Sequence, residues 1–563
     1  MKFSEINISN LVRSFFKEKF DYSTSLDEIN EQIRIVSGIR NFFLNISDVS
    51  ELLGLFDDSF LTIASENKIE YGDFQTNKEL AFEITNNLKK EGFFPQIVIE
   101  PTCGKGNFIL AVLNVFDNVE KVFGIEIQEK YSWQVKFNIL DFFLNNLNRK
   151  KPEIIIINSS IFGFNYTSIM ESITDKELLI IGNPPWVTNS SLGAINSQNL
   201  PPKTNFKQNK GLDSITGKAN FDIAESIIID LLRNFDKCSG KMALLVKNSV
   251  IKNIIYSLPK LRLLINGMQK QNIDSRKEFG VNVDASLFLC TLNSETGYIC
   301  KESDFYSSEI KGYFGWKNNR FMSDISYAEE YDIDGISQLV WRQGVKHDCA
   351  KIMEITREGN FYKNKLSESF IIEEDLVFPL LKSSDLKQKK SEYTNRNTII
   401  TQKYVGQNTS YIQKFPKTYA YLSNHIDKFR ERKSSIYKNK CDFAIFGIGN
   451  YSFKPYKIAI SGLYKTFHFC FVTPQNAKPV MLDDTCYFIG FDSEEDALFV
   501  WKLLNSEIVH NFLKSISFKD SKRMITKEIL MRIDLKKIAC AMGMDTTRID
   551  DIIKINGEQV SLF

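Results

Sequence analysis

The sequence lacks the residue patterns of a metal centre, a disulfide framework and a membrane-spanning segment. Its nine cysteines occur singly, without a Cys-x-x-Cys pair, and its four histidines lie far apart, at His347, His425, His468 and His510. This spacing offers neither zinc ligands nor paired cysteines, so we expect reduced cysteines and no metal site. No run of about 18 apolar residues is present, and the first residues lack the apolar stretch of a signal peptide. We therefore expect a cytoplasmic protein.

Length and charge distribution predict more than one domain. The chain has 563 residues, which is too long for a single hydrophobic core. Its 43% hydrophobic and 25% charged residues are typical of a globular protein. The net charge is only +2, yet between residues 401 and 470 a dozen Lys and Arg stand against three acidic residues. Aromatic and hydroxyl side chains interleave with these bases, a mixture that suits a phosphate backbone and nucleobases. The simpler alternative is a solvated charged face.

Residues 1–68 predict a small helical region, because apolar residues recur at helical spacing over 29–43 and 49–60. Glu66-Asn67-Lys68 after Asp57-Asp58 loosely matches the acid pattern of a metal-dependent nuclease. No strand signal surrounds these acids, so we attribute the match to chance. This region is expected to be a packing cap and not a second enzyme.

From residue 69 to residue 300, helices and strands alternate. Such alternation predicts an α/β fold, a doubly wound, Rossmann-like sheet. A helix is expected over 78–90, with Thr76 or Asn77 as its N-cap. Buried strands are expected over 96–100, 122–127, 153–158, 179–182, 241–246 and 285–291. The long polar loop after Trp186 is predicted to be a lid or a substrate-contacting segment.

The strand over 179–182 ends in Asn183-Pro184-Pro185-Trp186. The two prolines fix φ and remove two N–H donors, so neither a helix nor a strand ladder continues. The Asn183 side chain, the Pro184 carbonyl and the Trp186 ring then face the crevice beyond the strand, where open α/β sheets bind ligands. Two acceptors at this place can hold both N–H groups of an exocyclic amine and direct its lone pair at an electrophilic methyl group.

Two further motifs predict a nucleoside pocket beside this tetrapeptide. Residues 100–106 form a turn in which Gly104 and Gly106 allow close approach of a ligand, although a tight structural turn is an equal alternative. The dinucleotide pattern is incomplete because Ile109 replaces its third glycine, which disfavours pyrophosphate. Glu126 ends the next strand and is placed to accept both hydroxyls of a ribose.

Together with Phe74-Gln75-Thr76 and Phe279, these motifs resemble those of the gamma-class adenine-N6 DNA methyltransferases of restriction–modification systems. The resemblance implies S-adenosyl-L-methionine as cofactor and a flipped adenine as acceptor. It assigns the target amine to Asn183 and Pro184, next to Pro185, and the base sandwich to Trp186 and Phe279. The implied cofactor-binding residues are Phe74, Thr76, Glu100, Pro101, Thr102, Cys103, Gly104, Gly106, Glu126, Ser160 and Asn183.

The sequence departs from this family at two places. Ser159-Ser160 stands where the family usually has an acid that binds the cofactor's adenine, and a hydroxyl accepts that bond more weakly. Trp186 replaces the commoner Tyr or Phe and enlarges the stacking surface.

Residues 301–563 loosely resemble the family's target-recognition domain and are predicted to form an α+β DNA-binding domain. Short aromatic-rich strands and turns replace the alternation of helix and strand, and residues 494–514 are expected to be helical. The candidate DNA-binding residues are Arg432, Lys433, Ser434, Tyr437, Lys438, Tyr451, Lys454, Lys457, Lys522 and Arg523.

The sequence thus predicts a sequence-specific adenine-N6 methyltransferase of duplex DNA, acting as a monomer. A cognate restriction endonuclease would share its recognition site without forming a stable complex. The alternative acceptors are the N4 amine of cytosine, an RNA base or a glutamine amide, but glutamine methyltransferases are too short to explain residues 301–563. Another alternative is a DNA-binding subunit with an inactive methyltransferase domain. The intact Asn183–Trp186 motif and Glu126 argue against this alternative.

Overall fold

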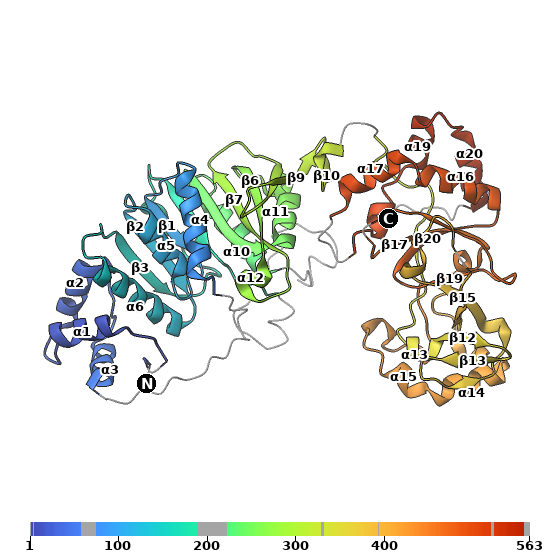
Figure 1. Ribbon diagram of the computed structural model, residues 1–563, viewed down its shortest axis with the longest axis horizontal. Helices are drawn as coiled ribbons and strands as arrows, with labels where there is room; N and C mark the ends of the chain where they lie inside the picture. Colours follow the sequence, from blue (N-terminus) through green and yellow to red (C-terminus); the bar gives the residue numbers. More distant parts are fainter. Residues whose placement is uncertain are drawn as a thin grey trace. The chain divides into compact units, whose positions relative to one another are not determined.

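A computed structural model of the chain describes residues 2–3, 5–57, 75–187, 222–327, 332–391, 393–464, 466–518 and 523–556. The chain forms two compact units, Met1–Phe321 and Met322–Phe563 (Figure 1). Phe74, Lys522, the nuclease-like residues 66–68 and most of the predicted lid lie outside the described residues. Within the described residues, no helix has the length and apolar character needed to cross a membrane.

Three short helices begin the first unit, α1 (Asn10–Lys19), α2 (Leu26–Ser37) and α3 (Ile46–Asp57). The expectation of one helix over 29–43 was wrong, because Gly38 adopts φ 76° and ends α2. A Cβ atom at Gly38 would lie 2.0 Å from the Pro152 carbonyl oxygen, so the chain turns here against the sheet. Ile39 then forms a parallel bridge with Ile154 at the sheet edge. The helical cap is thereby joined to the sheet.

A ten-stranded mixed sheet forms the centre of this unit, in the order β10-β9-β8-β6-β7-β5-β4-β1-β2-β3. The predicted parallel strands are present, and β7 joins β5 in antiparallel pairing. The α/β, Rossmann-like fold class is confirmed. The strands are β1 (Ile97–Glu100), β2 (Lys121–Glu126), β3 (Glu153–Asn158), β4 (Leu178–Gly182), β5 (Gly240–Lys247), β6 (Ile265–Ile273), β7 (Ala285–Leu292), β8 (Ile299–Asp304), β9 (Ile310–Lys317) and β10 (Arg320–Met322).

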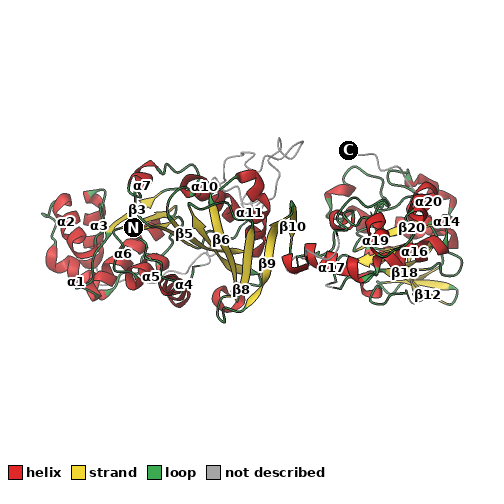
Figure 2. Ribbon diagram, turned by 90° about the horizontal axis from the view of Figure 1, so that it is seen from above, coloured by secondary structure: helices red, strands yellow, loops and turns green. Residues whose placement is uncertain are grey.

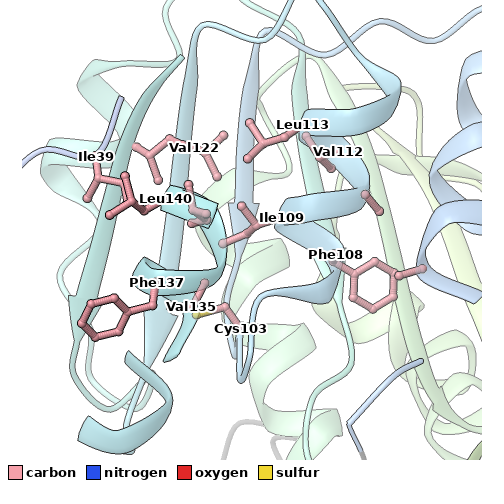
Figure 3. Packing of buried hydrophobic residues seen from close by; sticks show 14 of the residues in the cluster. Ile39, Cys103, Phe108, Ile109, Val112, Leu113, Val122, Val135, Phe137 and Leu140 are labelled. Atoms are coloured by element: carbon pink, nitrogen blue, oxygen red, sulfur yellow. The ribbon is translucent and has the colours of Figure 1, made fainter. Parts of the chain in front are cut away.

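Helices cover both faces of the sheet (Figure 2). On one face lie α4 (Lys78–Lys90), α5 (Asn107–Val115) and α6 (Glu129–Asn145); on the other lie α7 (Thr167–Glu171), α10 (Ile223–Phe235) and α11 (Asn248–Leu261). Between the sheet and the first set, Ile109 and Val112 of α5 pack with Val122 of β2 and with Val135 and Leu140 of α6 (Figure 3). This core fixes the strand ends from which the pocket described below is built.

The sheet continues through β8, β9 and β10 to Met322, past residue 300. Strand β6 was not predicted from the sequence. Its residues are mostly polar, its buried positions do not alternate regularly, and its pairing with β7 shifts register between Asn266 and Gln269. A bulged, polar strand shows no regular alternation of apolar residues.

The second unit contains two sheets, as expected of an α+β domain. The four-stranded sheet consists of β11 (Arg342–Gln343), β20 (Cys486–Phe491), β17 (Tyr456–Ser461) and β18 (Cys470–Val472). The six-stranded sheet consists of β14 (Ser369–Phe370), β13 (Phe361–Asn364), β12 (Glu354–Glu358), β16 (Arg396–Ile399), β15 (Val377–Leu381) and β19 (Met481–Leu482). The helices include α14 (Pro416–Asn424), α15 (Ile426–Arg430), α16 (Glu494–Leu504), α17 (Glu507–Ile516), α19 (Leu535–Ala541) and α20 (Thr547–Asn556). The predicted helix over 494–514 is two helices, because Ser506 caps a new one.

Candidate active site

A pocket of about 970 Å³, including space open to solvent, lies at the carboxyl ends of β1, β2, β3 and β4. The pocket brings together residues predicted from four separate motifs: Thr76, Glu100, Pro101, Thr102, Cys103, Gly104, Glu126, Asn183, Pro184, Pro185 and Trp186.

The turn after β1 forms one wall of the pocket. Gly104 and Gly106 have φ values of 51° and 80°, a left-handed backbone that favours glycine. A Cβ atom at Gly104 would lie 2.6 Å from the Gln75 side-chain oxygen, and one at Gly106 would lie 2.2 Å from Val135 Cγ2. The Lys105 N–H donates to the same Gln75 oxygen at 3.2 Å. The left-handed backbone therefore favours glycine at both positions, and Val135 leaves little room for a side chain at Gly106.

Glu126 closes the pocket at the end of β2. Its Oε2 accepts a hydrogen bond from the Gly104 N–H at 2.8 Å, and its Oε1 accepts one from the Gln128 N–H at 2.7 Å. Only 7% of the residue is exposed. Two backbone donors thus hold the carboxylate in place at the edge of the pocket.

Glu100 is the second acid of the pocket and is buried at the end of β1. Burial raises the pKa of its carboxyl well above the usual range, and the nearby negative charge of Glu126 raises it further. The Ile109 N–H, which donates to Glu100 Oε2 at 3.3 Å, opposes this shift. The two carboxyls thus differ in character, since only Glu126 accepts two backbone hydrogen bonds.

Thr76 lies between the turn and the start of α4. Its carbonyl accepts a hydrogen bond from Asn107 Nδ2 at 2.6 Å, and Asn77 caps α4 by accepting from the Leu80 N–H at 2.7 Å. The Thr76 hydroxyl oxygen is buried and has no hydrogen-bond partner among the described residues. A buried hydroxyl that lines a pocket in this way suits a polar ligand group.

The Asn183–Trp186 segment forms the opposite wall. The Thr102 hydroxyl donates to the Asn183 carbonyl at 3.4 Å, which links the first and fourth strand ends. Trp186 is only 5% exposed, and its indole N–H donates to the Leu245 carbonyl at 3.2 Å. Its ring meets Phe279 edge to face, with centroids 4.9 Å apart and planes at 66°. Phe279 ends the short helix α12 (Ser275–Phe279), is half-buried, and is absent from the pocket lining.

After β3, Ser159 lines the pocket whereas Ser160 does not. The Ser160 hydroxyl accepts from the Phe162 N–H at 3.1 Å and so shapes the turn. Phe162 and Ile161 lie beside Ser159 in the pocket wall, and Ile127 adds an apolar side chain that is 39% exposed. These residues form an apolar surface suited to a flat ring.

Sequence patterns missed several lining residues. Gln75 lies inside the Phe74-Gln75-Thr76 motif, and Asn107 directly follows the glycine turn, so the position of both was a usable signal. Tyr131 of α6, Ile223 and Ile227 of α10 carry no motif, and only the fold brings them to the pocket.

Comparison with known proteins decides the family. No protein-family profile matches the chain. Over 478 residues the chain is 41% identical to the type II methyltransferase M.NspV of Nostoc sp., and the match covers 84% of this chain and 98% of that protein. The chain belongs to the type II methyltransferases. This confirms the predicted membership among the methyltransferases of restriction–modification systems.

Solved structures of similar fold include two other restriction–modification proteins. The type IIL enzyme MmeI, solved in complex with DNA, aligns with a TM-score of 0.49 and 14% identity, covering 100% of this chain and 94% of that one. A type I methyltransferase subunit from Streptococcus thermophilus aligns with a TM-score of 0.33 and 12% identity, covering 56% of this chain and 72% of that one.

In the second unit of this type II methyltransferase, three predicted DNA-binding residues are used internally. Arg432 donates to the carbonyls of Phe429, His347, Ala444 and Asp442. Its guanidinium lies 3.7 Å from the Tyr437 ring centroid, and Tyr437 is buried. Lys457 has 0% exposure, and its ammonium donates to the Lys454 carbonyl at 2.7 Å. Lys457 therefore cannot contact DNA in this structure, and the expectation for it is corrected.

The other predicted DNA-binding residues that the structure describes lie nearer the surface. Lys433 and Lys438 are exposed and Ser434 is half-buried. Lys454 pairs with Asp492 at 3.2 Å. The half-buried Tyr451 lies 4.8 Å from the Arg342 guanidinium, and Arg523 donates to the Asp484 carbonyl at 3.4 Å.

Proposed function

We propose that this type II methyltransferase transfers a methyl group from S-adenosyl-L-methionine to the N6 amine of an adenine within a specific sequence of duplex DNA. One observation carries the proposal: the glycine turn after β1, Glu126 and Asn183–Trp186 line a single pocket. A donor site and an amine-holding site are thereby adjacent, as group transfer requires.

The residues of the pocket fit the cofactor. Glu126 offers two oriented oxygens to the ribose hydroxyls, and the Thr76 hydroxyl offers a further polar contact. Ile127, Ile161 and Phe162 provide an apolar surface for the adenine ring. When bound, S-adenosyl-L-methionine supplies a methyl group on a positively charged sulfur.

Asn183 and Pro184 are the residues that would hold the target amine. The Asn183 side-chain oxygen and the Pro184 carbonyl would each accept one N–H of the amine, which directs its lone pair into the pocket. Transfer relieves the charge of the sulfonium, so positioning and electrostatics suffice and the surplus proton leaves afterwards. Trp186 would stack on the target base, which must leave the duplex at a cost of about a few kcal/mol.

The closest competing acceptor is the N4 amine of cytosine, which presents the same pair of N–H groups. The test is to express the protein in a host that lacks DNA methylation and to analyse hydrolysed genomic DNA by mass spectrometry. N6-methyladenine at one mapped sequence motif is expected. Detection of N4-methylcytosine instead would show that the acceptor is cytosine. Unmodified DNA, together with no cofactor binding in calorimetry, would contradict the proposal.

A further inference from the structure

Glu278 joins two parts of the first unit that are far apart in the sequence. Its Oε2 accepts from Asn77 Nδ2 at 2.7 Å, and its Oε1 accepts from the Tyr306 hydroxyl at 2.7 Å. Lys277 adds an ion pair at 3.4 Å, and the Glu278 side chain is only 6% exposed. Both oxygens of a nearly buried carboxylate are thus bound to neighbours, and one of these belongs to the segment before α4.

The Asn77 side of this link leads directly to the cofactor pocket. Asn77 follows Gln75 and Thr76, which both line the pocket. Gln75 accepts from the Lys105 N–H at 3.2 Å, and the Thr76 carbonyl accepts from Asn107 at 2.6 Å. Residues 75–77 are therefore held by the glycine turn on one side and by Glu278 on the other.

The other side of the link leads to the aromatic pair. Phe279 follows Glu278 directly and meets Trp186 edge to face at 4.9 Å. A base stacked between two rings needs about 7 Å between their planes, because each contact takes about 3.5 Å. Phe279 must therefore shift relative to Trp186 before a base fits between them. Asp274 caps α12 and Gly280, at φ 69°, ends it, so Glu278 and Phe279 belong to one single-turn helix that is bounded at both ends.

We propose that Glu278 is a positioning residue that ties Phe279 to the cofactor loop, residues 75–77. Occupancy of the cofactor pocket then sets the position of Phe279 against Trp186, and with it the fit of the target base. This inference rests on the proposed function. A connection through a buried carboxylate transmits a shift because losing either partner leaves an oxygen without its hydrogen bond.

The test measures how strongly the cofactor product S-adenosylhomocysteine tightens DNA binding. The probe is a duplex with the mapped recognition sequence and 2-aminopurine at the target position, read by affinity and by fluorescence. In Glu278→Ala, the tightening is expected to fall about tenfold, while S-adenosylhomocysteine binds within about twofold of wild type without DNA. Glu278→Gln and Tyr306→Phe should each lose part of the effect, and they decide the test if Glu278→Ala does not fold.

Glu309→Gln is the matched control, because Glu309 is an exposed acid on the same unit and should leave the coupling unchanged. Equal tightening in wild type and Glu278→Ala would overturn the inference, as would absence of any tightening in wild type. Failure of the proposed function is distinguishable, since wild type would then form no N6-methyladenine.

A separate observation concerns a loop of the second unit, of which residues 387–391 and 393–395 are described. Its backbone is attached to β18, because the Phe471 N–H donates to the Lys389 carbonyl at 2.8 Å and the Ser391 N–H donates to the Phe471 carbonyl at 3.0 Å. The Thr394 N–H donates to the Gln475 side chain at 3.2 Å. The backbone of this loop is therefore fixed to a sheet edge.

Several side chains of the same loop are exposed, whereas the Ser391 hydroxyl is buried. Lys387, Lys389 and Lys390 are exposed and form no ion pair with any acid in the described part of the chain. Tyr393 is 69% exposed, and its hydroxyl accepts from Asn476 at 3.3 Å. Fixed backbone, unpaired cations and an exposed ring suit a phosphate backbone with bases beside it. By contrast, Arg432 and Tyr437 are used internally.

We infer that residues 387–391 and 393–395 form a contact surface for the phosphates of duplex DNA. This also rests on the proposed function, but DNA binding is measured independently of methylation. A triple variant, Lys387→Ala, Lys389→Ala and Lys390→Ala, is expected to bind any duplex more weakly and to lower the slope of log affinity against log salt by about one per lost contact.

The control removes three other exposed lysines, Lys17, Lys19 and Lys260, from the first unit. An unchanged salt slope in the loop variant overturns the inference, and so does an equal loss in the control. A wild-type protein that binds no duplex would count against the proposed function itself.

Discussion

The Oε2 atom of Glu126 lies 2.8 Å from the backbone nitrogen of Gly104. This hydrogen bond joins the end of β2 to the turn after β1 and fixes two walls of the pocket relative to each other. If Glu126 binds a ribose, replacing it changes both the ligand contact and the turn. Glu126→Gln is expected to weaken binding of S-adenosyl-L-methionine by about tenfold to a hundredfold, since hydrogen bonds to a charged group are lost.

Calorimetry with the isolated cofactor measures this effect. Glu120→Gln is the matched control, because Glu120 directly precedes the same strand and pairs with Lys176 away from the pocket. Unchanged affinity in Glu126→Gln would remove Glu126 from the cofactor site.

Asn183→Ala is expected to lower the single-turnover methylation rate by at least about a hundredfold, because one of the two acceptors for the target amine is removed. Cofactor affinity should stay within a few-fold of wild type. Asn118→Ala, which removes an amide bound to the Pro95 carbonyl, should methylate normally. Wild-type turnover in Asn183→Ala would exclude this role of the side chain.

Trp186 stabilises the fold as well as lining the pocket. Trp186→Phe keeps a ring but loses the indole bond to Leu245, and should lower the free energy of unfolding by about 1 kcal/mol while retaining activity. Trp186→Ala also loses the buried ring and should cost about 3–5 kcal/mol. Urea unfolding with activity assays separates the two variants, and equal stability in both would show that burial of the ring contributes little.

Lys457 should make stability depend on pH. Burial lowers the pKa of its ammonium to about 7 in the folded protein, whereas the unfolded chain keeps the usual value of about 10.5. Between these values the unfolded state binds more protons, so stability rises with pH. The loss of folding stability caused by the buried Lys457 is therefore complete below about pH 7 and disappears toward pH 10.5.

Lys457→Met is therefore expected to stabilise the protein most near pH 6, by up to about 4 kcal/mol, with a gain that shrinks at higher pH. Denaturant unfolding across this range measures the gain. Lys433→Met, at an exposed lysine, should show no such trend. A gain independent of pH would mean that the pKa of Lys457 is the same in the folded and the unfolded protein, so that burial does not lower it.

Local patterns in the sequence determined the elements around the pocket. The β-branched run before Asn183 is β4, and α4 spans Lys78–Lys90 with Asn77 as its cap, as expected. These elements follow from chain-local rules: apolar runs form buried strands, side-chain oxygens cap helices, and prolines end strands. The turn glycines and Glu126 could likewise be predicted because each lies directly at a strand end.

Only the tertiary structure decided which polar residues are exposed to solvent and which are buried or bound to distant parts of the chain. Lys433 and Lys457 belong to the same basic segment, yet one is exposed and the other has 0% exposure, because β17 is covered on both sides. The bond between Asn77 and Glu278 spans 201 positions of the chain. Burial and long-range pairing depend on how elements pack, and residue type and spacing along the chain do not encode that packing locally.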